Sequence, residues 1–232
     1  MSNAVLPHPV RPKSPAAPTG LSVAVFSAVW LALVFVFGAG EVFVAPRGAL
    51  PLALLIAGAA PIILFLAAFW VSQPFRESVL AADLRLATGV QAWRFAGFGF
   101  LALYANGVLP GYFAWPAGLG DVAISIAAPL LVVALIRRPG FAASKTFVAW
   151  NVLGVLDLVV AVGTGAFGSL LFGDVAGAVT TAPMARLPLV LIPAYFVPAF
   201  IILHLTALFQ ARRLGGSSGG PERRAAGLRS RL

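Results

Sequence analysis

The sequence contains no cysteine, and this absence excludes several kinds of site. Disulfide bonds, thiolate nucleophiles, iron–sulfur clusters and cysteine-based zinc sites all need thiols. Lysine is nearly absent as well: Lys13 and Lys145 are the only two, and neither lies in the middle of an apolar run, which excludes a retinal Schiff base of the rhodopsin type. His204 is the only histidine after residue 19, and one histidine makes neither a bis-histidine haem site nor a metal cluster. We therefore expect no metal and no cofactor.

Charged residues are scarce too, and this scarcity identifies lipid as the solvent of most of the chain. They make up 10% of the 232 residues, against 60% hydrophobic residues, and the mean hydropathy is +0.98. Such a composition is typical of a membrane protein. A transmembrane helix takes about 20 residues to cross about 30 Å of hydrocarbon, so the chain has room for about six spans and no sizeable soluble domain.

The apolar runs predict an all-α fold, a polytopic membrane bundle of six transmembrane helices. This transmembrane domain is expected to occupy residues 20–209, with helices at 20–44, 49–71, 88–108, 121–136, 144–165 and 187–209. The proline-rich residues 1–19 are expected to form a disordered cytosolic lead, and residues 210–232 a disordered arginine-rich cytosolic tail. The amphipathic stretch PFRESVLAADLRLA favours a helix on the membrane surface, with a cytosolic extension of the third span as the alternative.

Basic residues indicate the orientation of these spans. With six crossings, fourteen of the sixteen Lys and Arg residues fall on one side, and only Arg47 and Arg186 fall on the other. An excess of Lys and Arg marks the cytoplasmic face, so both termini are predicted inside. The net charge of +9 is therefore assigned to orientation and to contact with membrane lipids, and nucleic acid is not expected as a partner.

Asp157 falls inside the apolar stretch WNVLGVLDLVVAV. It lies about 20 Å along the helix that is expected to begin at Ser144, well within the hydrocarbon. Gly154 and Ala161 share its helix face, and small residues let another helix approach closely, so Asp157 is expected to face protein. A proton- or ion-handling carboxylate is the functional interpretation, and a polar tie between helices is the structural one.

Arg94 is the candidate partner of Asp157, since it lies about two turns into the third predicted span. If the two side chains pair, Asp157 stays ionised. If they do not, desolvation favours the protonated carboxyl that a proton relay needs. The alternative for Arg94 is that its long side chain extends to the headgroups of the inner leaflet.

Four further polar residues complete the candidate set. Asn151 is expected to hydrogen-bond across helices, and His204 to be a hydrogen-bonded core residue, with a relay to Asp157 as its alternative role. Asp121 is expected to cap the fourth predicted helix, or to act as an acid at the outer face paired with Arg186. The P-loop and HExxH motifs are both absent, so an enzyme is the less favoured class.

Prolines recur in the last predicted span, at Pro188, Pro193 and Pro198. An interior proline removes a backbone hydrogen bond, so this helix is expected to kink. The freed carbonyls would either line a cavity, as in the broken helices of transporters, or be satisfied by a neighbouring helix.

The segments LPGYFAWPAGLGD, AWNVLGVLDLVVAV and RLPLVLIPAYFVPAFIILH together resemble a loose group of uncharacterised bacterial six-helix inner-membrane proteins. The resemblance covers residues 90–210. It implies a multi-pass protein of the bacterial cytoplasmic (inner) membrane. It implies no activity and carries over no site residue.

Two functions of different classes follow from these observations. In the first, Asp157, Arg94 and the other interior polar groups serve permeation or proton-coupled transport of a small solute. In the second, the same groups fix helix contacts in an accessory or scaffold subunit, which binds another membrane protein or a second copy of itself. The sequence identifies neither the solute nor the partner.

Overall fold

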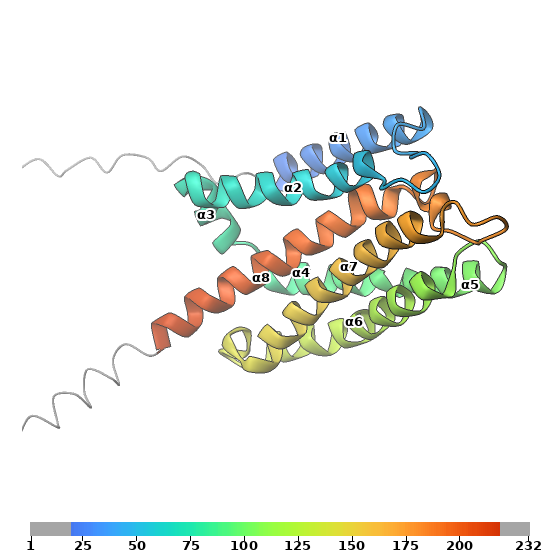
Figure 1. Ribbon diagram of the computed structural model, residues 1–232. Coiled ribbons are helices and arrows are strands. Elements are labelled where there is room, and N and C mark those ends of the chain that lie inside the picture. The colour runs from blue at the N-terminus through green and yellow to red at the C-terminus, as the bar shows by residue number, and fades with distance from the viewer. Residues whose placement is uncertain (1–19, 219–232) are drawn as a thin grey trace, which may run out of the picture.

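The computed structural model describes residues 20–218, which form helices and no strand (Figure 1). This confirms the predicted all-α class. The long helices are α1 (Gly20–Ala39), α2 (Leu52–Val71), α6 (Gly111–Arg137), α7 (Lys145–Phe172) and α8 (Val197–Ser218). The shorter ones are α3 (Gln73–Leu80), α4 (Leu84–Val90), α5 (Phe98–Ala105), the 3-10 helices η1 (Gln91–Gly97), η2 (Phe141–Ala143) and η3 (Ala182–Ala185), and the π-helical turn η4 (Ile192–Phe196). The predicted lead at 1–19 and the tail residues 219–232 lie outside the described residues.

Five helices in the described range are long and apolar enough to cross a membrane: α1, α2, α6, α7 and the run Ile192–Gly216, which joins η4 to α8. Large apolar side chains are exposed along them, such as Phe26, Leu64 and Leu130. A surface of this kind is stable in lipid, where helices also satisfy their own backbone hydrogen bonds. The chain is a multi-pass membrane protein.

The third predicted span, residues 88–108, is not one α-helix. Instead α4, η1 and α5 follow one another between Leu84 and Ala105, with seven residues of 3-10 helix in the middle. Runs of 3-10 helix beyond three or four residues are uncommon, and inside a longer helix they mark strain or function. The whole run lies antiparallel to α6, because Tyr104 of α5 contacts Trp115 while Gly89 of α4 faces Val132.

The long segments run in alternating directions, so the molecule has two ends (Figure 1). The α3 end gathers α3, the start of α4, the link from α6 to α7 and the end of α8, where Gln210 donates 2.9 Å hydrogen bonds to the carbonyls of Val79 and Ala82. The loop end gathers residues 40–51, 106–110 and 173–191. Arg47 and Arg186 lie at the loop end, whereas the described basic residues at the α3 end are Arg76, Arg85, Arg137, Arg138, Lys145, Arg212 and Arg213.

Several helix bounds differ from those predicted. α6 begins at Gly111 instead of residue 121 and holds Pro116 in its interior, because a backbone in lipid must satisfy its own polar groups and helix continues through such residues. For the same reason α7 extends past 165 to Phe172. α8 continues past 209 to Ser218, into the predicted tail. α1 ends at Ala39 and α2 begins at Leu52, inside their predicted bounds.

The predicted surface helix is split by a turn at 81–83, where Asp83 caps α4.

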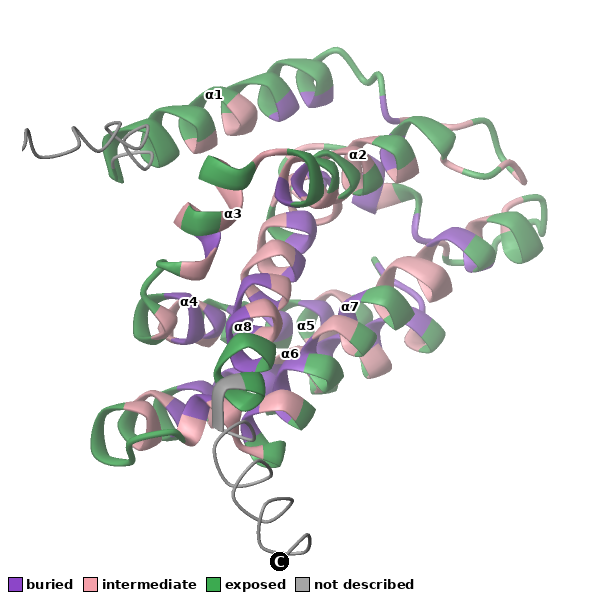
Figure 2. Ribbon diagram, turned by 90° about the vertical axis from the view of Figure 1, so that its left-hand side faces the viewer, coloured by how far each residue is buried: buried purple, intermediate pink, exposed green. Residues whose placement is uncertain are grey.

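α8 lies in the middle of the bundle, between the α1–α2 pair and the α6–α7 pair (Figure 2). Of the prolines predicted to distort this helix, Pro193 lies in the π-helical turn η4, which directly precedes α8, and Pro198 lies in the first turn of α8. α1 is peripheral: its buried residues are Val34 and Gly38, and the ring of Trp30 contacts that of Tyr195 at 4.7 Å between centroids. The polar interior therefore belongs to the segments from α4 to α8.

Candidate functional site

Arg94 is the centre of a buried polar cluster. It lies on η1, and its side chain is 0% exposed. Its Nε donates a 2.7 Å hydrogen bond to Oδ1 of Asp121 on α6, and its Nη2 donates to Oδ2 of Asp157 on α7. A guanidinium often binds one carboxylate through two nitrogens. Here two nitrogens bind two carboxylates, so one side chain joins three helical segments.

The remaining nitrogen of Arg94 extends the cluster to α8. Nη1 donates to the carbonyl oxygen of Gly154 at 3.3 Å and lies 3.2 Å from Nε2 of His204. Arginine has donors and no acceptor, so Nε2 of His204 accepts this bond and carries no proton. The ring proton is therefore on Nδ1, and His204 is neutral.

Asn151 of α7 closes the network and fixes the direction of its hydrogen bonds. Nδ1 of His204 donates to Oδ1 of Asn151 at 2.9 Å, and Nδ2 of Asn151 donates to the carbonyl oxygen of Phe147 at 2.8 Å. His204 and Asn151 are 0% and 1% exposed. A buried polar group is stable when its donors and acceptors are matched in this way. This branch of the cluster is satisfied and rigid.

Glycines allow the charged segments to approach one another. A Cβ at Gly120 of α6 would overlap the carboxylate of Asp157, and one at Gly97 of η1 would overlap Asp121. A Cβ at Gly154 of α7 would overlap the ring of His204. Small residues at helix contacts permit this close approach inside a membrane. These three glycines therefore leave room for the side chains of Asp121, Asp157 and His204.

The formal charges of the cluster do not balance. Two carboxylates, when ionised, face one guanidinium, and His204 is neutral, which leaves one excess negative charge. An unpaired charge in a membrane interior costs free energy, and binding of one proton or one cation removes it. The side chains of Asp121 and Asp157 retain 15% and 14% exposure, whereas that of Arg94 has none. The carboxylates are therefore the accessible partners.

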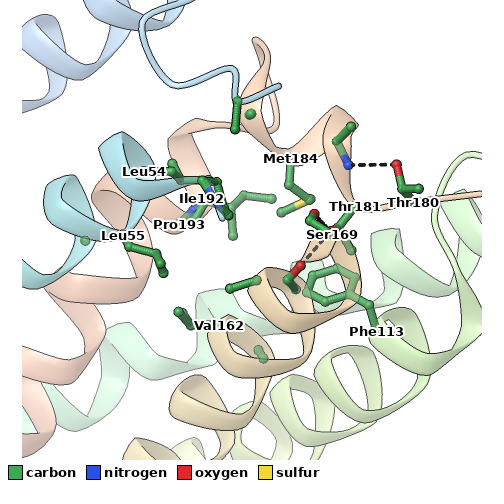
Figure 3. A pocket seen from close by; sticks show the side chains of 18 of the residues that line it. Leu54, Leu55, Phe113, Val162, Ser169, Thr180, Thr181, Met184, Ile192 and Pro193 are labelled. Carbon is green, nitrogen blue, oxygen red and sulfur yellow. Dashed lines mark hydrogen bonds between the residues drawn. The ribbon is translucent and has the colours of Figure 1, made fainter. Parts of the chain in front are cut away.

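A cavity of about 780 Å³ extends from the loop end to Asp121. In Figure 3, Leu54 and Leu55 of α2 stand on one side of it, and Val162 and Ser169 of α7 on the other. Most of the lining is apolar. Near the loop end, the hydroxyls of Ser169 and Thr181 lie 2.7 Å apart. The cavity offers a small molecule an apolar chamber with a carboxylate at its deep end.

The structure brings the four predicted intramembrane residues together. Arg94, Asp157, His204 and Asn151 form one connected network, in which Arg94 pairs with Asp157 and does not extend to the headgroups. His204 reaches Asp157 through Arg94 and not directly. No group of three or more His, Asp or Glu side chains between residues 20 and 218 is arranged as a metal site.

Asp121 and Arg186, which were alternatively predicted to pair at the outer face, do not contact each other in the structure and have other partners. Asp121 does not cap a helix, because α6 begins ten residues earlier, and it pairs with Arg94 inside the bundle instead of with Arg186. Arg186 pairs with Glu41 at 3.2 Å, and both side chains are more than half exposed, at 51% and 61%. Glu41 and Arg186 therefore form an exposed ion pair at the loop end.

These features define a multi-pass α-helical membrane protein with a buried arginine–carboxylate cluster. A family model for a domain of unknown function, DUF8737, matches residues 51–212, and the chain belongs to this family. The matched range runs from α2 to α8 and contains every residue of the cluster, whereas α1 precedes it. No curated protein and no solved structure matches the chain.

Proposed function

We propose that this protein carries protons through a membrane and also permits the permeation of a small solute, and that Asp121 and Asp157 are its proton-binding groups. The observation that carries the proposal is the pairing of two carboxylates with one buried guanidinium at the end of a cavity. A site with one excess negative charge gains a proton readily and can lose it again when its surroundings change.

The proposed topology has six crossings with both termini in the cytoplasm. The run from α4 to α5 supplies the sixth crossing, since it lies along α6 and spans 84–105. The concentration of arginines at the α3 end supports placing that end in the cytoplasm, and the loop end then faces outward. The resemblance noted above favours a bacterial inner membrane as the location.

Within this arrangement the proton resides on a carboxylate and not on His204. Nε2 of His204 accepts a hydrogen bond from Arg94, so a proton there would set two cations against each other at 3.2 Å. Protonation of Asp157 instead leaves Arg94 paired with Asp121 and makes the cluster neutral. Arg94 thus holds whichever carboxylate is ionised.

The cavity indicates what kind of solute accompanies the proton. Leu54, Phe113, Val162 and Met184 line it with apolar surface, and its polar groups are few. Pockets of this size and character suit small, largely apolar molecules that are oriented by one or two polar contacts. Asp121 at the deep end and the hydroxyl of Ser169 would supply those contacts.

Proton flux in proteoliposomes tests the proposal. The protein is reconstituted with a trapped pH dye, and a potassium diffusion potential drives protons inward. Wild type should acidify the vesicles faster than empty liposomes, and Asp157→Asn should reduce the rate to that of empty liposomes, because the amide keeps the shape but cannot ionise. Glu41→Gln removes an exposed carboxylate outside the cluster and should match wild type. Equal rates for wild type and Asp157→Asn would contradict the proposal.

A second candidate, an accessory or scaffold subunit, is favoured by a different observation. α1 lies outside the family match and exposes an apolar surface, with Val34 and Gly38 as its buried residues. Such a helix is suited to contact another membrane protein, and the Arg94 network would then serve as a structural tie. In that case Asp157→Asn should lower thermal stability without changing proton flux.

A further inference from the structure

Three buried polar atoms between residues 20 and 218 have no hydrogen-bond partner in the protein: Thr88 Oγ1, Gln91 Oε1 and Trp150 Nε1. Thr88 is 2% exposed, Gln91 is 1% exposed and Trp150 is 7% exposed. Nearly all buried polar groups in proteins find a partner, either in the protein or in ordered water. Each of these three atoms therefore needs an explanation.

Two of these residues lie on the same stripe as the centre of the cluster. Thr88 lies in α4, and Gln91 and Arg94 lie in η1, at a spacing of three residues. Residues three apart are neighbours on the surface of an α-helix and eclipse one another on a 3-10 helix, so the three lie along one side of this run. Gln91 Nε2 donates to the carbonyl oxygen of Phe200 at 3.2 Å, which fixes the amide on α8 and leaves Oε1 unpaired. The stripe begins near the α3 end and leads to Arg94.

Trp150 lies beside the same region from α7. Its ring centroid is 5.2 Å from that of His204, which itself contacts Arg94. Trp150 also lies between Lys145, the first residue of α7, and Asp157 along that helix. Trp150 therefore lies toward the α3 end from Asp157 along α7, as Thr88 and Gln91 lie toward that end from Arg94.

We infer that internal water molecules bridge Thr88, Gln91 and Trp150, and that they form the inner half of the proton path, from the α3 end to the Arg94 cluster. The inference rests on the proposed function and adds to it the route from the cluster to the cytoplasm. The cavity beside Asp121 supplies the outer half. The two halves of the path meet at the cluster. The outer half ends at Asp121, and the inner half ends at Arg94 and His204.

Water fits these groups better than an ion does. The indole N–H donates, the amide oxygen accepts, and the threonine hydroxyl does both. A cation would be left facing the indole donor, and an anion would face the amide oxygen. A water molecule donates and accepts at once, and linked waters conduct protons along their hydrogen bonds.

Substitutions that keep shape but remove the polar atoms test the path. In full-length protein reconstituted in phosphatidylethanolamine and phosphatidylglycerol vesicles, Thr88→Val and Gln91→Leu should each slow proton flux by about tenfold, the equivalent of one lost hydrogen bond. Thr164→Val is the matched control, because the Thr164 hydroxyl bonds the carbonyls of its own helix at 2.8 and 3.1 Å, and it should leave the flux unchanged. Wild-type flux in both Thr88→Val and Gln91→Leu overturns the inference.

A second measurement detects the water itself and does not depend on flux. X-ray radiolysis generates hydroxyl radicals from bound water, and mass spectrometry should find Trp150 oxidised in wild type despite its burial. Gln91→Leu should reduce that oxidation, while Thr164→Val should not. Equal oxidation of Trp150 in Gln91→Leu and wild type overturns the inference. Absence of proton flux in wild type, with water-dependent oxidation of Trp150 retained, would refute the proposed function and the proton path, and would leave only the water bridge between the three residues.

Discussion

Nε of Arg94 donates a 2.7 Å hydrogen bond to Oδ1 of Asp121, although the two residues lie on different helices, η1 and α6. This contact takes one nitrogen of the edge with which a guanidinium usually holds a single carboxylate. The other nitrogen of that edge, Nη2, holds Asp157. Because one edge of the guanidinium holds two carboxylates, the site contains two acidic groups and one positive charge.

Removal of the arginine should destabilise the protein strongly. Arg94→Leu leaves two buried carboxylates without a cation, a change that costs about 3–5 kcal/mol when one partner of a buried ion pair is deleted. Thermal unfolding in mild detergent measures the loss. Arg186→Leu is the control, because its pair with Glu41 is exposed and is worth about 0–1 kcal/mol.

Neutralising the carboxylates should rescue the Arg94 variant. Asp121→Asn and Asp157→Asn combined with Arg94→Leu remove every formal charge from the cluster, and replacing a buried ion pair with neutral groups is often close to neutral for stability. The triple variant should therefore unfold at a higher temperature than Arg94→Leu alone. A triple variant less stable than Arg94→Leu would show that the carboxylates are not left unpaired by loss of the arginine.

A single methyl group beside the cluster should disturb it without changing its charge. Gly120→Ala places a Cβ where the Asp157 carboxylate lies, so Asp157 must move away from Arg94. We expect a loss of about 1–3 kcal/mol, typical of overpacking, and slower proton flux. Gly99→Ala is the matched control, since its Cβ would meet nothing within 4 Å. Equal behaviour of the two variants would contradict the contact between Gly120 and Asp157.

The tautomer of His204 can be observed directly. Nitrogen-15 magnetic resonance of the His8→Ala variant, in which His204 is the only histidine, should show a protonated Nδ1 and an unprotonated Nε2. The reason is that Nε2 accepts from Arg94 while Nδ1 donates to Asn151. In Asn151→Leu the Nδ1 signal should shift, because its acceptor is gone. A protonated Nε2 in the parent protein would contradict the hydrogen-bond directions given above.

The proposed sixth crossing can be tested by cysteine labelling, because the sequence contains no native cysteine that would react with the label. Ala82→Cys and Asn106→Cys introduce single exposed thiols on either side of the run from α4 to α5. A membrane-impermeant maleimide added to intact cells should label Asn106→Cys and should reach Ala82→Cys after lysis. Labelling of both thiols from the same side would contradict the crossing.

The sequence predicted which residues belong to the cluster better than it predicted how they are arranged. Asp157 and Arg94 were identifiable because a charge inside an apolar run must find a partner, and Asn151 and His204 because they were the remaining polar groups nearby. Asp121 was assigned to a helix start, since LPGYFAWPAGLG suggests a loop in water. In lipid the same residues are helical, which moves Asp121 into the bundle interior.

The 3-10 winding of η1 was not predictable from the apolar pattern of residues 88–108. The last residue of η1, Gly97, lies close to Asp121 of α6, a tertiary contact with no local signal in the sequence. Gly120 and Gly154 could have indicated where helices meet, because small residues near a buried charge favour close packing. Only the three-dimensional arrangement shows which side chain of the cluster packs against each glycine.

The Arg94 cluster is proposed to gain and lose a proton, and infrared difference spectroscopy between alkaline and acidic buffer measures this directly. Wild type in lipid should show the carbonyl stretch of a protonated carboxyl on acidification, and the Asp121→Asn/Asp157→Asn double variant should lack that band. Glu41→Gln, which leaves the cluster intact, should retain it. A double variant whose difference spectrum equals that of wild type would contradict the account.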